Sequence, residues 1–295
     1  MCAQSLQNRA AAIDYYNHGN ERYRKGDYDG AIADYTQAID LSSRLEQDPR
    51  PRGLDYRKNA LPEQEGIRVL DTFTAMPYAN RCLARYRKGE YEAALSDCDR
   101  AISINPRLVE AYNNRGSIRY EREDFDGALA DFERALKIKP LDAETYNNRG
   151  NVRRDKGDLE GALSDFDRAI MLSPNHATIF CNRGNTRKMA GDLLGALSDF
   201  NQAIRLDPHL SWGYYGRAVA QRDQGEFEKA IADFDRAIEL DPKFPMPYGD
   251  KGLALLLQGK DNEAAQEFEK CLKLDPKLKS KLEERIEAVR AIMKK

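Results

Sequence analysis

The sequence predicts an all-α fold in which helical hairpins stack into a solenoid. First, prolines recur every 34 residues, at Pro106, Pro140, Pro174, Pro208, Pro242 and Pro276. Second, small and aromatic residues recur between them at spacings of 3, 4 and 7, the period of helices with one packed face. Third, a glycine near the middle of almost every period supplies the left-handed residue that ends a first helix. A 34-residue hairpin cannot enclose its own apolar face, so it must stack on its neighbours.

The period divides the chain into seven copies. They occupy residues 12–45, 75–108, 109–142, 143–176, 177–210, 211–244 and 245–278. The first copy has Ser43 in place of the recurrent proline. Outside the copies lie an N-terminal segment (1–11), an insertion (46–74) and a terminal segment (279–295).

Each copy carries the same residue types at the same repeat positions. In 109–142 these are Tyr112 at position 4, Gly116 at 8, Ala128 at 20, Phe132 at 24, Ala135 at 27 and Pro140 at 32. Position 15 is glycine in six copies, with Glu123 as the exception. On these positions the sequence resembles the tetratricopeptide repeat family. The resemblance implies a right-handed superhelix whose first helices line a concave surface, at positions 2, 5, 6, 9, 12 and 13.

Charge and hydropathy exclude two classes of partner. The chain has 295 residues, with 47 basic against 49 acidic side chains. This balance gives no broad cationic field for nucleic acid. The longest apolar run, Leu253 to Leu257, is far shorter than a membrane-spanning helix. Met1 to Ala12 has no apolar stretch of signal-peptide length, so we expect a cytoplasmic protein.

The five cysteines are odd in number and form no CxxC motif, which predicts reduced thiols. Cys82, Cys98 and Cys271 fall at small-residue or ring packing positions, whereas Cys181 is predicted to lie on the concave surface. Three histidines (His18, His176 and His209) show no metal-ligand spacing, and no nucleotide-binding or nucleophile motif occurs. We therefore expect no metal, no cofactor and no enzyme activity.

Opposite charges recur at positions 7 and 23. Position 7 reads His18, Arg81, Arg115, Arg149, Arg183, Arg217 and Lys251, and position 23 reads Asp34, Asp97, Asp131, Asp165, Asp199, Asp233 and Glu267. Arginines also recur at position 11. The pairs are interpreted as structural, within a repeat or between neighbours, each contributing about 0 to 1 kcal/mol if partly exposed. An anion-binding ladder is the alternative.

Asparagine recurs at position 6, as Asn17, Asn80, Asn114, Asn148 and Asn182. It is a mediocre residue in a helix interior, but its amide offers the donor and acceptors that hold a peptide backbone. Superhelical members of the family, to which this pattern is similar, grip an extended chain with such a ladder. Asn20, Asn113, Asn147, Asn151 and Asn185 widen the predicted strip. The alternatives are asparagines bonded within the scaffold, or duplication without selection for binding.

Aromatic residues on the same surface are candidate anchors. They are Tyr23, Tyr86 and Tyr120 at position 12, and Trp212 with Tyr215 in the sixth copy. Tryptophan and tyrosine are enriched among binding hot spots. Alternatively, Trp212 packs against the adjoining hairpin.

The first three copies also resemble the co-chaperone modules that clamp a C-terminal carboxylate. The cations of that clamp would fall at Tyr16, Glu110 and Asn114, and all three are missing. A carboxylate clamp is therefore not predicted.

Two segments outside the repeats have expected structures. The insertion is expected to be a loop followed by a helical extension into the second copy, with disorder as the alternative. The terminal segment carries Leu282, Ile286, Val289 and Ile292 or Met293 at helical spacing, which predicts a helix covering the last hairpin. A helix lying on a membrane surface is the alternative.

The sequence thus predicts a non-enzymatic adaptor whose concave strip holds an extended peptide segment of another protein. A co-chaperone or assembly factor, engaging folded clients through the insertion and the convex surface, is the second possibility. A scaffold that regulates an enzyme partner is the third.

Overall fold

The computed structural model describes residues 2–47 and 63–293. These residues form fifteen α-helices and one short 3₁₀ turn, and this described part contains no β-strand. The fold is therefore an all-α solenoid of helical hairpins, as the repeats predict. The chain divides into two compact units, residues 1–152 and 153–295.

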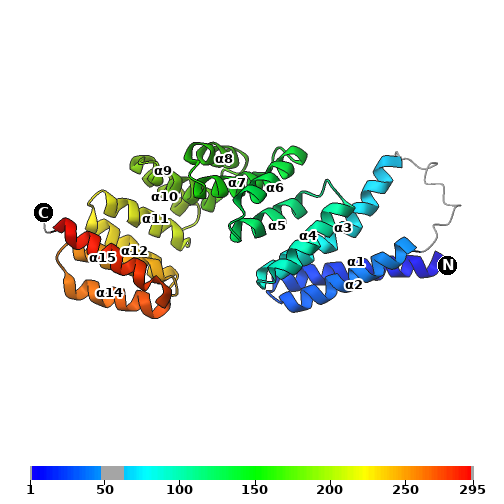
Figure 1. The fold of residues 1–295 in the computed structure, drawn as a ribbon, viewed down its shortest axis with the longest axis horizontal. Helices are drawn as coiled ribbons and strands as arrows, with labels where there is room; N and C mark the ends of the chain where they lie inside the picture. The colour runs from blue at the N-terminus through cyan, green and yellow to red at the C-terminus, as the bar shows by residue number, and fades with distance from the viewer. Residues whose placement is uncertain (1, 48–62, 294–295) are drawn as a thin grey trace. The chain divides into compact units, whose positions relative to one another are not determined.

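The first unit is built from successive hairpins (Figure 1). Its helices are α1 (Cys2–Arg24), α2 (Tyr28–Gln47), α3 (Glu63–Arg87), α4 (Tyr91–Ile104), α5 (Val109–Glu121), α6 (Phe125–Ile138) and α7 (Ala143–Asp155), within which the division falls. Helix α2 contacts both α1 and α3, and α4 contacts both α3 and α5. The first helices α1, α3 and α5 also contact one another in sequence. Each second helix therefore fills the space between two first helices.

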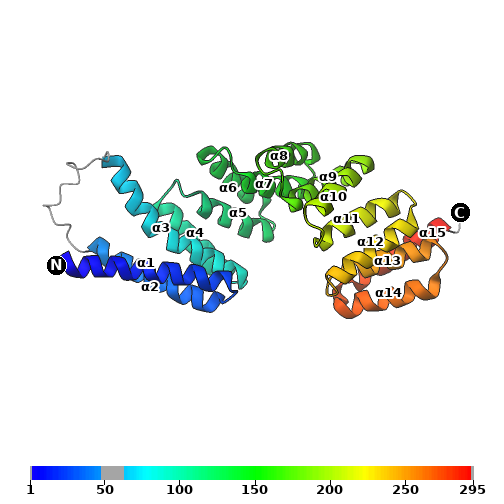
Figure 2. The same ribbon diagram turned by 180° about the vertical axis from the view of Figure 1, so that it is seen from behind.

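The second unit repeats this arrangement (Figure 2). Its helices are α8 (Leu159–Leu172), α9 (Ala177–Met189), α10 (Leu193–Leu206), α11 (Ser211–Asp223), α12 (Phe227–Leu240), α13 (Pro245–Leu257), α14 (Asp261–Leu274) and α15 (Lys279–Met293), with the turn η2 (Pro276–Leu278) before α15. Helices α9, α11 and α13 contact one another in sequence, and α15 contacts α13. Helix α15 thus occupies the place of a further first helix.

The helices around the insertion are longer than the repeat pattern. Helix α2 has 20 residues, against 14 in α4, because Ser43 does not end the helix as proline does elsewhere. Helix α3 begins at Glu63, so the expected helical extension precedes the second copy. The expected loop falls on residues 48–62, outside the described residues. Helix α1 begins at Cys2, so the N-terminal segment continues into the first copy.

The turn within each hairpin depends on position 15. Its glycines have positive φ, for example 86° at Gly157, as predicted. Glu123 adopts the same left-handed conformation, with φ of 61°. The turn then leads into a capped helix, because Asp124 accepts a 3.0 Å hydrogen bond from the backbone N–H of Gly127. A Cβ at Gly127 would collide with that carboxylate.

The centre of most repeats is a ring packed on a small residue. At Gly116 an added Cβ would lie 2.8 Å from the ring of Phe132, and at Gly184 one would lie 3.0 Å from the ring of Phe200. Both rings are fully buried. Positions 8 and 24 therefore fix how closely the two helices of a hairpin approach.

Candidate functional site

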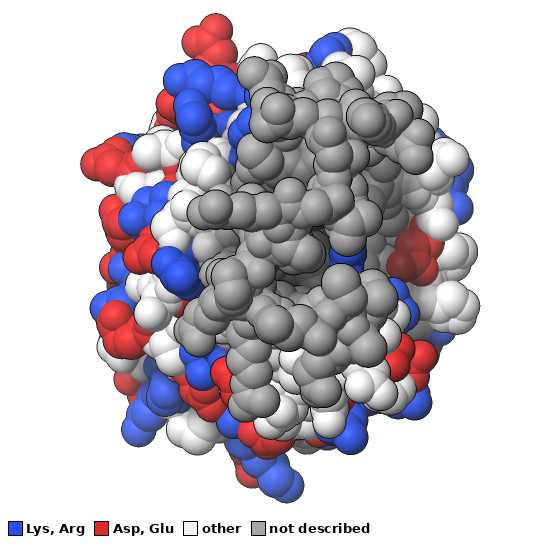
Figure 3. Space-filling model, turned by 90° about the vertical axis from the view of Figure 1, so that its right-hand side faces the viewer, with Lys and Arg blue, Asp and Glu red and all other residues white. Residues whose placement is uncertain are grey.

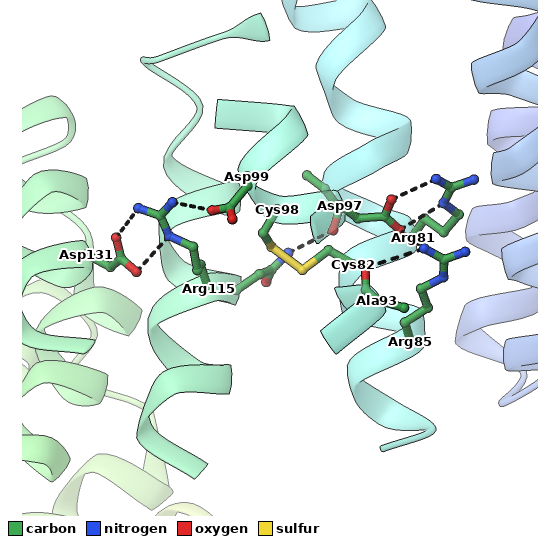
Figure 4. Close-up of a disulfide and its surroundings, with 11 residues drawn as sticks. Arg81, Cys82, Arg85, Ala93, Asp97, Cys98, Asp99, Arg115 and Asp131 are labelled. Carbon is green, nitrogen blue, oxygen red and sulfur yellow. Dashed lines mark hydrogen bonds and ion pairs between the residues drawn. A yellow bond between two sulfur atoms is a disulfide. The ribbon is translucent and has the colours of Figure 1, made fainter. Parts of the chain in front are cut away.

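Five of the seven predicted charge pairs at positions 7 and 23 are seen within single repeats, whereas in the first repeat Asp34 contacts Arg22 of position 11, at 3.2 Å, instead of His18. In the second repeat Arg81 donates to Asp97 from Nε at 2.8 Å and from Nη2 at 2.7 Å (Figure 4). The same two-bond geometry recurs at Arg115–Asp131, Arg183–Asp199 and Arg217–Asp233, and Lys251 contacts Glu267 at 3.2 Å. In these repeats the position 7 cation therefore pairs with position 23 of its own repeat, not with position 23 of a neighbouring repeat.

The third nitrogen of the position 7 cation reaches the preceding repeat. Nη1 of Arg115 donates to Asp99 at 2.5 Å, and Nη1 of Arg81 donates to Thr36 at 2.9 Å. The guanidinium of Arg115 also lies 5.7 Å from the ring centre of Tyr112. Burial alone would lower the pKa of Arg115, but the hydrogen bonds to Asp131 and Asp99 outweigh it and raise the pKa. All three nitrogens of this guanidinium therefore donate to protein carboxylates, which favours the structural interpretation over an anion ladder.

The carboxylates of these pairs are buried, which corrects their expected energy. Asp131 is 2% exposed and also receives Arg119 from position 11, at 2.8 Å. The sequence-based figure assumed partly exposed pairs. Removing one partner of a buried pair leaves an uncompensated charge and destabilises by about 3 to 5 kcal/mol. Breaking one of these pairs is therefore more costly than the sequence-based figure, whereas the net contribution of an intact pair is small.

The first predicted asparagines belong to a hydrogen-bond network between the first two repeats. Nδ2 of Asn80 donates to Oδ1 of Asn20 at 2.8 Å and to the hydroxyl of Tyr16 at 3.1 Å. The hydroxyl of Tyr35 also donates to Oδ1 of Asn20, at 2.9 Å. Asn17 is exposed on the same helix. Asn20 thus acts as a link inside the scaffold.

The later asparagines of the first unit are half-buried and also contact the scaffold. Asn114 donates from Nδ2 to the backbone carbonyl of Ala79 in the preceding repeat, at 3.0 Å. Asn113 accepts a 2.9 Å bond from the hydroxyl of Thr145, and Asn147 donates to Oδ1 of Asn148 at 3.3 Å. The side chains of Asn151, Asn182 and Asn185 are likewise half-buried. Several amide donors are therefore used between first helices.

The position 12 tyrosines pack on the ring five residues later. Tyr86 lies 6.1 Å from Tyr91, and Tyr120 lies 6.0 Å from Phe125, measured between ring centres. Burial and the neighbouring Glu121 raise the pKa of Tyr86. Both residues are half-buried, so they are not fully enclosed by the scaffold.

Trp212 packs against neighbouring rings, as the alternative predicts, and its role as an anchor stays a prediction. Its ring centre lies 4.5 Å from that of Phe244 and 5.7 Å from that of Tyr215, yet the residue stays 46% exposed. It packs on neighbouring rings and presents an open face. The hydroxyl of Tyr215 donates to Asp250 at 2.9 Å.

A charged network around Asp250 is present that the sequence pattern does not predict. This carboxylate is 1% exposed and receives hydrogen bonds from Arg222 on α11 and Arg285 on α15, in addition to Tyr215. Burial and the charge of Asp250 raise the pKa of Tyr215. The available signal was the replacement of asparagine by aspartate at position 6. The network ties the terminal helix to the sixth and seventh repeats.

The prediction of reduced thiols is wrong at Cys82 and Cys98, and the predicted location of the free Cys181 is wrong as well. Cys82 and Cys98 form a disulfide between α3 and α4, with their Cα atoms 5.6 Å apart (Figure 4). Cys181 is 3% exposed, so it does not lie open on the concave surface. Burial, with Asp199 and Asp207 nearby, raises the pKa of the Cys181 thiol to about 12. A buried protonated thiol is not a nucleophile.

The terminal helix packs as a cover over most of its predicted stripe. Leu282 is buried, and Ile286 and Val289 pack against a cluster that contains Leu255 and Leu256 of α13. Ile292 and Met293 are 66% and 47% exposed, so the apolar contact ends at Val289.

The described residues contain neither a candidate membrane span nor a candidate metal site. None of the helices described is long and apolar enough to cross a membrane. No group of three or more histidine, cysteine or acidic side chains in this part of the chain is arranged to hold a metal ion.

Sequence profiles of the tetratricopeptide repeat match along the chain. They cover residues 15–44, 81–149, 150–191, 211–244 and 247–278. The chain belongs to the tetratricopeptide repeat family. Proteins of this family bind other proteins, and their fold is typical of non-catalytic interaction scaffolds.

Solved structures of tetratricopeptide repeat proteins share the fold. One from Parabacteroides merdae is 19% identical with a TM-score of 0.67, covering 95% of this chain and 99% of its own. PilF of Pseudomonas aeruginosa is 18% identical with a TM-score of 0.60, covering 68% and 92%. The APC/C hetero-tetramer Cut9–Hcn1 contains a chain that is 14% identical with a TM-score of 0.65, covering 85% and 52%. These likenesses establish the architecture.

Proposed function

We propose that this protein is a non-enzymatic adaptor whose first-helix surface holds an extended peptide segment of a partner protein. The observation that carries the proposal is the state of Asn80 and Asn114. Each fixes its Nδ2 within the scaffold, while its Oδ1 is neither buried nor bonded among the described residues. A fixed, open amide oxygen is an acceptor for a peptide N–H.

The surrounding residues support a backbone ligand. Asn17 and Asn148 lie at the same repeat position as Asn80 and Asn114. Tyr86 and Tyr120 are half-buried and lie six residues after Asn80 on α3 and after Asn114 on α5. In the second unit, Asn182, Asn185, Trp212 and Tyr215 carry the corresponding roles. Amide bonds of about 1 kcal/mol each give sequence-tolerant holding, and the rings supply affinity.

Charge distribution supports a protein rather than a nucleic acid as partner. On the face shown in Figure 3, basic and acidic side chains lie side by side over the described surface. The interspersed signs fit the near-zero net charge of −2. A near-neutral chain offers phosphate backbones little electrostatic gain on binding.

The proposal is tested by selecting binders from a phage-displayed random dodecapeptide library on the full-length protein. The selected peptides are then titrated against an Asn80→Ala, Asn114→Ala double variant. The matched control replaces Asn175 and Asn262, which are exposed and lie outside the described first helices. We expect weaker binding of about tenfold or more in the ladder variant and none in the control. Unchanged binding would assign recognition to another part of the chain, such as the insertion.

A further inference from the structure

The second unit contains a pocket at the junction of α11, α13 and α15. Its volume is about 250 Å³, and its lining includes Tyr215, Met246, Gly249, Lys281, Leu282 and Arg285. A cavity of about 150 Å³ suffices for benzene, whereas drug-sized ligands occupy about 300 Å³ or more. The pocket therefore has room for one large side chain, not for an extended cofactor.

The seventh repeat has glycine at position 5, and this glycine lines the pocket. The other six copies have Tyr16, Ala79, Asn113, Asn147, Cys181 and Tyr215 there. A Cβ at Gly249 would lie 3.2 Å from Sγ of Cys271 and 3.6 Å from Cδ1 of Leu282. A longer side chain at this position would fill the space. The wall at Met246 is unbranched and adapts its shape to a guest.

The rim of the pocket carries one cation without an ion-pair partner among the described residues. Arg285 pairs with Asp250, and Arg222 pairs with Asp250 and with Asp223. Lys281 lies one turn before Arg285 on α15, and it forms no ion pair within the described residues. An anionic group beside the pocket would therefore be attracted rather than repelled.

The apolar lining continues onto an exposed ring. Tyr215 lines the pocket and also contacts Trp212, whose ring centre is 5.7 Å away and which is 46% exposed. Exposed aromatic and methionine side chains beside a pocket are typical of an anchor in a protein interface.

We infer that this pocket anchors the partner segment by one large apolar side chain, with an adjacent acidic residue held by Lys281 and Arg285. The inference rests on the proposed function, since it names the residues of the peptide that the second unit recognises. Shape selects the apolar group, and the unpaired lysine selects the acid next to it.

The test uses the peptides selected on the full-length protein and three variants. Gly249→Leu fills the pocket, and Lys281→Glu reverses the charge at its rim. Lys279→Glu is the control, because Lys279 lies on the same helix but is not among the pocket residues. Binding is followed by the fluorescence of Trp212, the only tryptophan of the chain. Circular dichroism and melting verify that each variant is folded.

We expect the selected peptides to be enriched in large apolar residues next to aspartate or glutamate, and to shift the emission of Trp212. Gly249→Leu and Lys281→Glu should each weaken them about fivefold or more, and Lys279→Glu should not. If Gly249→Leu does not fold, Lys281→Glu decides. Selected peptides that lack this pair, or that bind Lys281→Glu unchanged, overturn the inference and leave the adaptor proposal standing. A library that yields no binder overturns both.

Discussion

Cys82 and Cys98 are joined at the two positions where the other repeats pack a ring on a small residue. In the third repeat those positions hold Gly116 and Phe132, in contact. Both cysteines are completely buried between α3 and α4. The covalent bond therefore substitutes for the missing ring in holding this hairpin together.

Reduction should accordingly loosen the second repeat. The bond closes a sequence separation of 16 residues, for which a disulfide contributes about 3 kcal/mol. We expect a lower urea midpoint after reduction. In denaturant without reductant, iodoacetamide should label two thiols fewer than with it, as mass spectrometry measures. Equal labelling would show that the bond does not form. Because structural disulfides form in oxidising compartments, the same measurement on protein from its own cell tests the predicted cytoplasmic location.

Loss of a buried charge pair should be more damaging than loss of an exposed charge. Arg115→Ala leaves the buried carboxylate of Asp131 without its two-bond partner. Because Asp131 keeps its 2.8 Å bond from Arg119, we expect the free energy of unfolding to fall by about 1.5 to 3 kcal/mol, less than for a carboxylate left with no partner. Arg134→Ala on the exposed side of α6 is the control and should change little. Equal urea midpoints for both variants would contradict a structural role for the pairs.

Helix capping should differ between repeats in a way that the turns specify. Asp124 caps α6 through the N–H of Gly127, whereas Glu226 makes no side-chain cap bond to α12. Asp124→Ala should therefore destabilise by about 1 kcal/mol, and Glu226→Ala should have little effect. Thermal melting of the two variants compares them directly. A larger loss in Glu226→Ala would be incompatible with this assignment.

Replacing Glu123 by glycine should increase the stability of the turn in the third repeat. Its left-handed backbone disfavours a side chain by about 1 kcal/mol, so Glu123→Gly should raise stability. Gly157→Ala makes the opposite change at the equivalent position, where nothing lies near the added Cβ, and should lower it by a similar amount. Urea denaturation of the pair isolates the backbone effect. A destabilised Glu123→Gly protein would mean that its side chain makes a contact that outweighs the strain.

The thiol of Cys181 should resist alkylation in the folded protein. Burial raises its pKa from 9.0 to about 12, so the thiolate is scarce at pH 8. Because the folded pKa lies above the unfolded one, the neutral thiol favours folding below pH 9. That contribution is lost as the pH rises from 9 towards 12. Iodoacetamide labelling, mapped by mass spectrometry, should modify Cys181 only after denaturation. Rapid labelling of folded protein at pH 8 would contradict its burial.

Most of the architecture could be predicted from the repeat pattern, because residue type and spacing agree between the copies. Positive φ at the turn glycines followed from their place at the end of each first helix. The spacing of 16 residues between Arg81 and Asp97 left open whether the pair forms within a repeat, since a stacked neighbour is equally near. Only the packed helices decide it.

The disulfide and the Asp250 network needed knowledge of contacts. Cys82 and Cys98 are also 16 residues apart, at repeat positions 8 and 24. These positions are in contact in other repeats, for example at Gly116 and Phe132, and this was the available signal for a disulfide. The number of cysteines does not reveal this disulfide, because an odd total is compatible both with free thiols and with one bonded pair. The partners of Asp250 come from α11 and α15, a combination that no single repeat contains.

The reach of Arg115 has a consequence for how such a chain can change its length. This side chain contacts Asp99, 16 residues before it, and Asp131, 16 residues after it. Deleting or duplicating a whole 34-residue copy would present each such arginine with an equivalent pair of acceptors. An insertion of one or two residues in a hairpin turn would shift the second helix and separate the arginine from its own aspartate. Gene rearrangements that respect the period should therefore yield folded proteins with fewer or more copies, whereas small insertions in the turns should not.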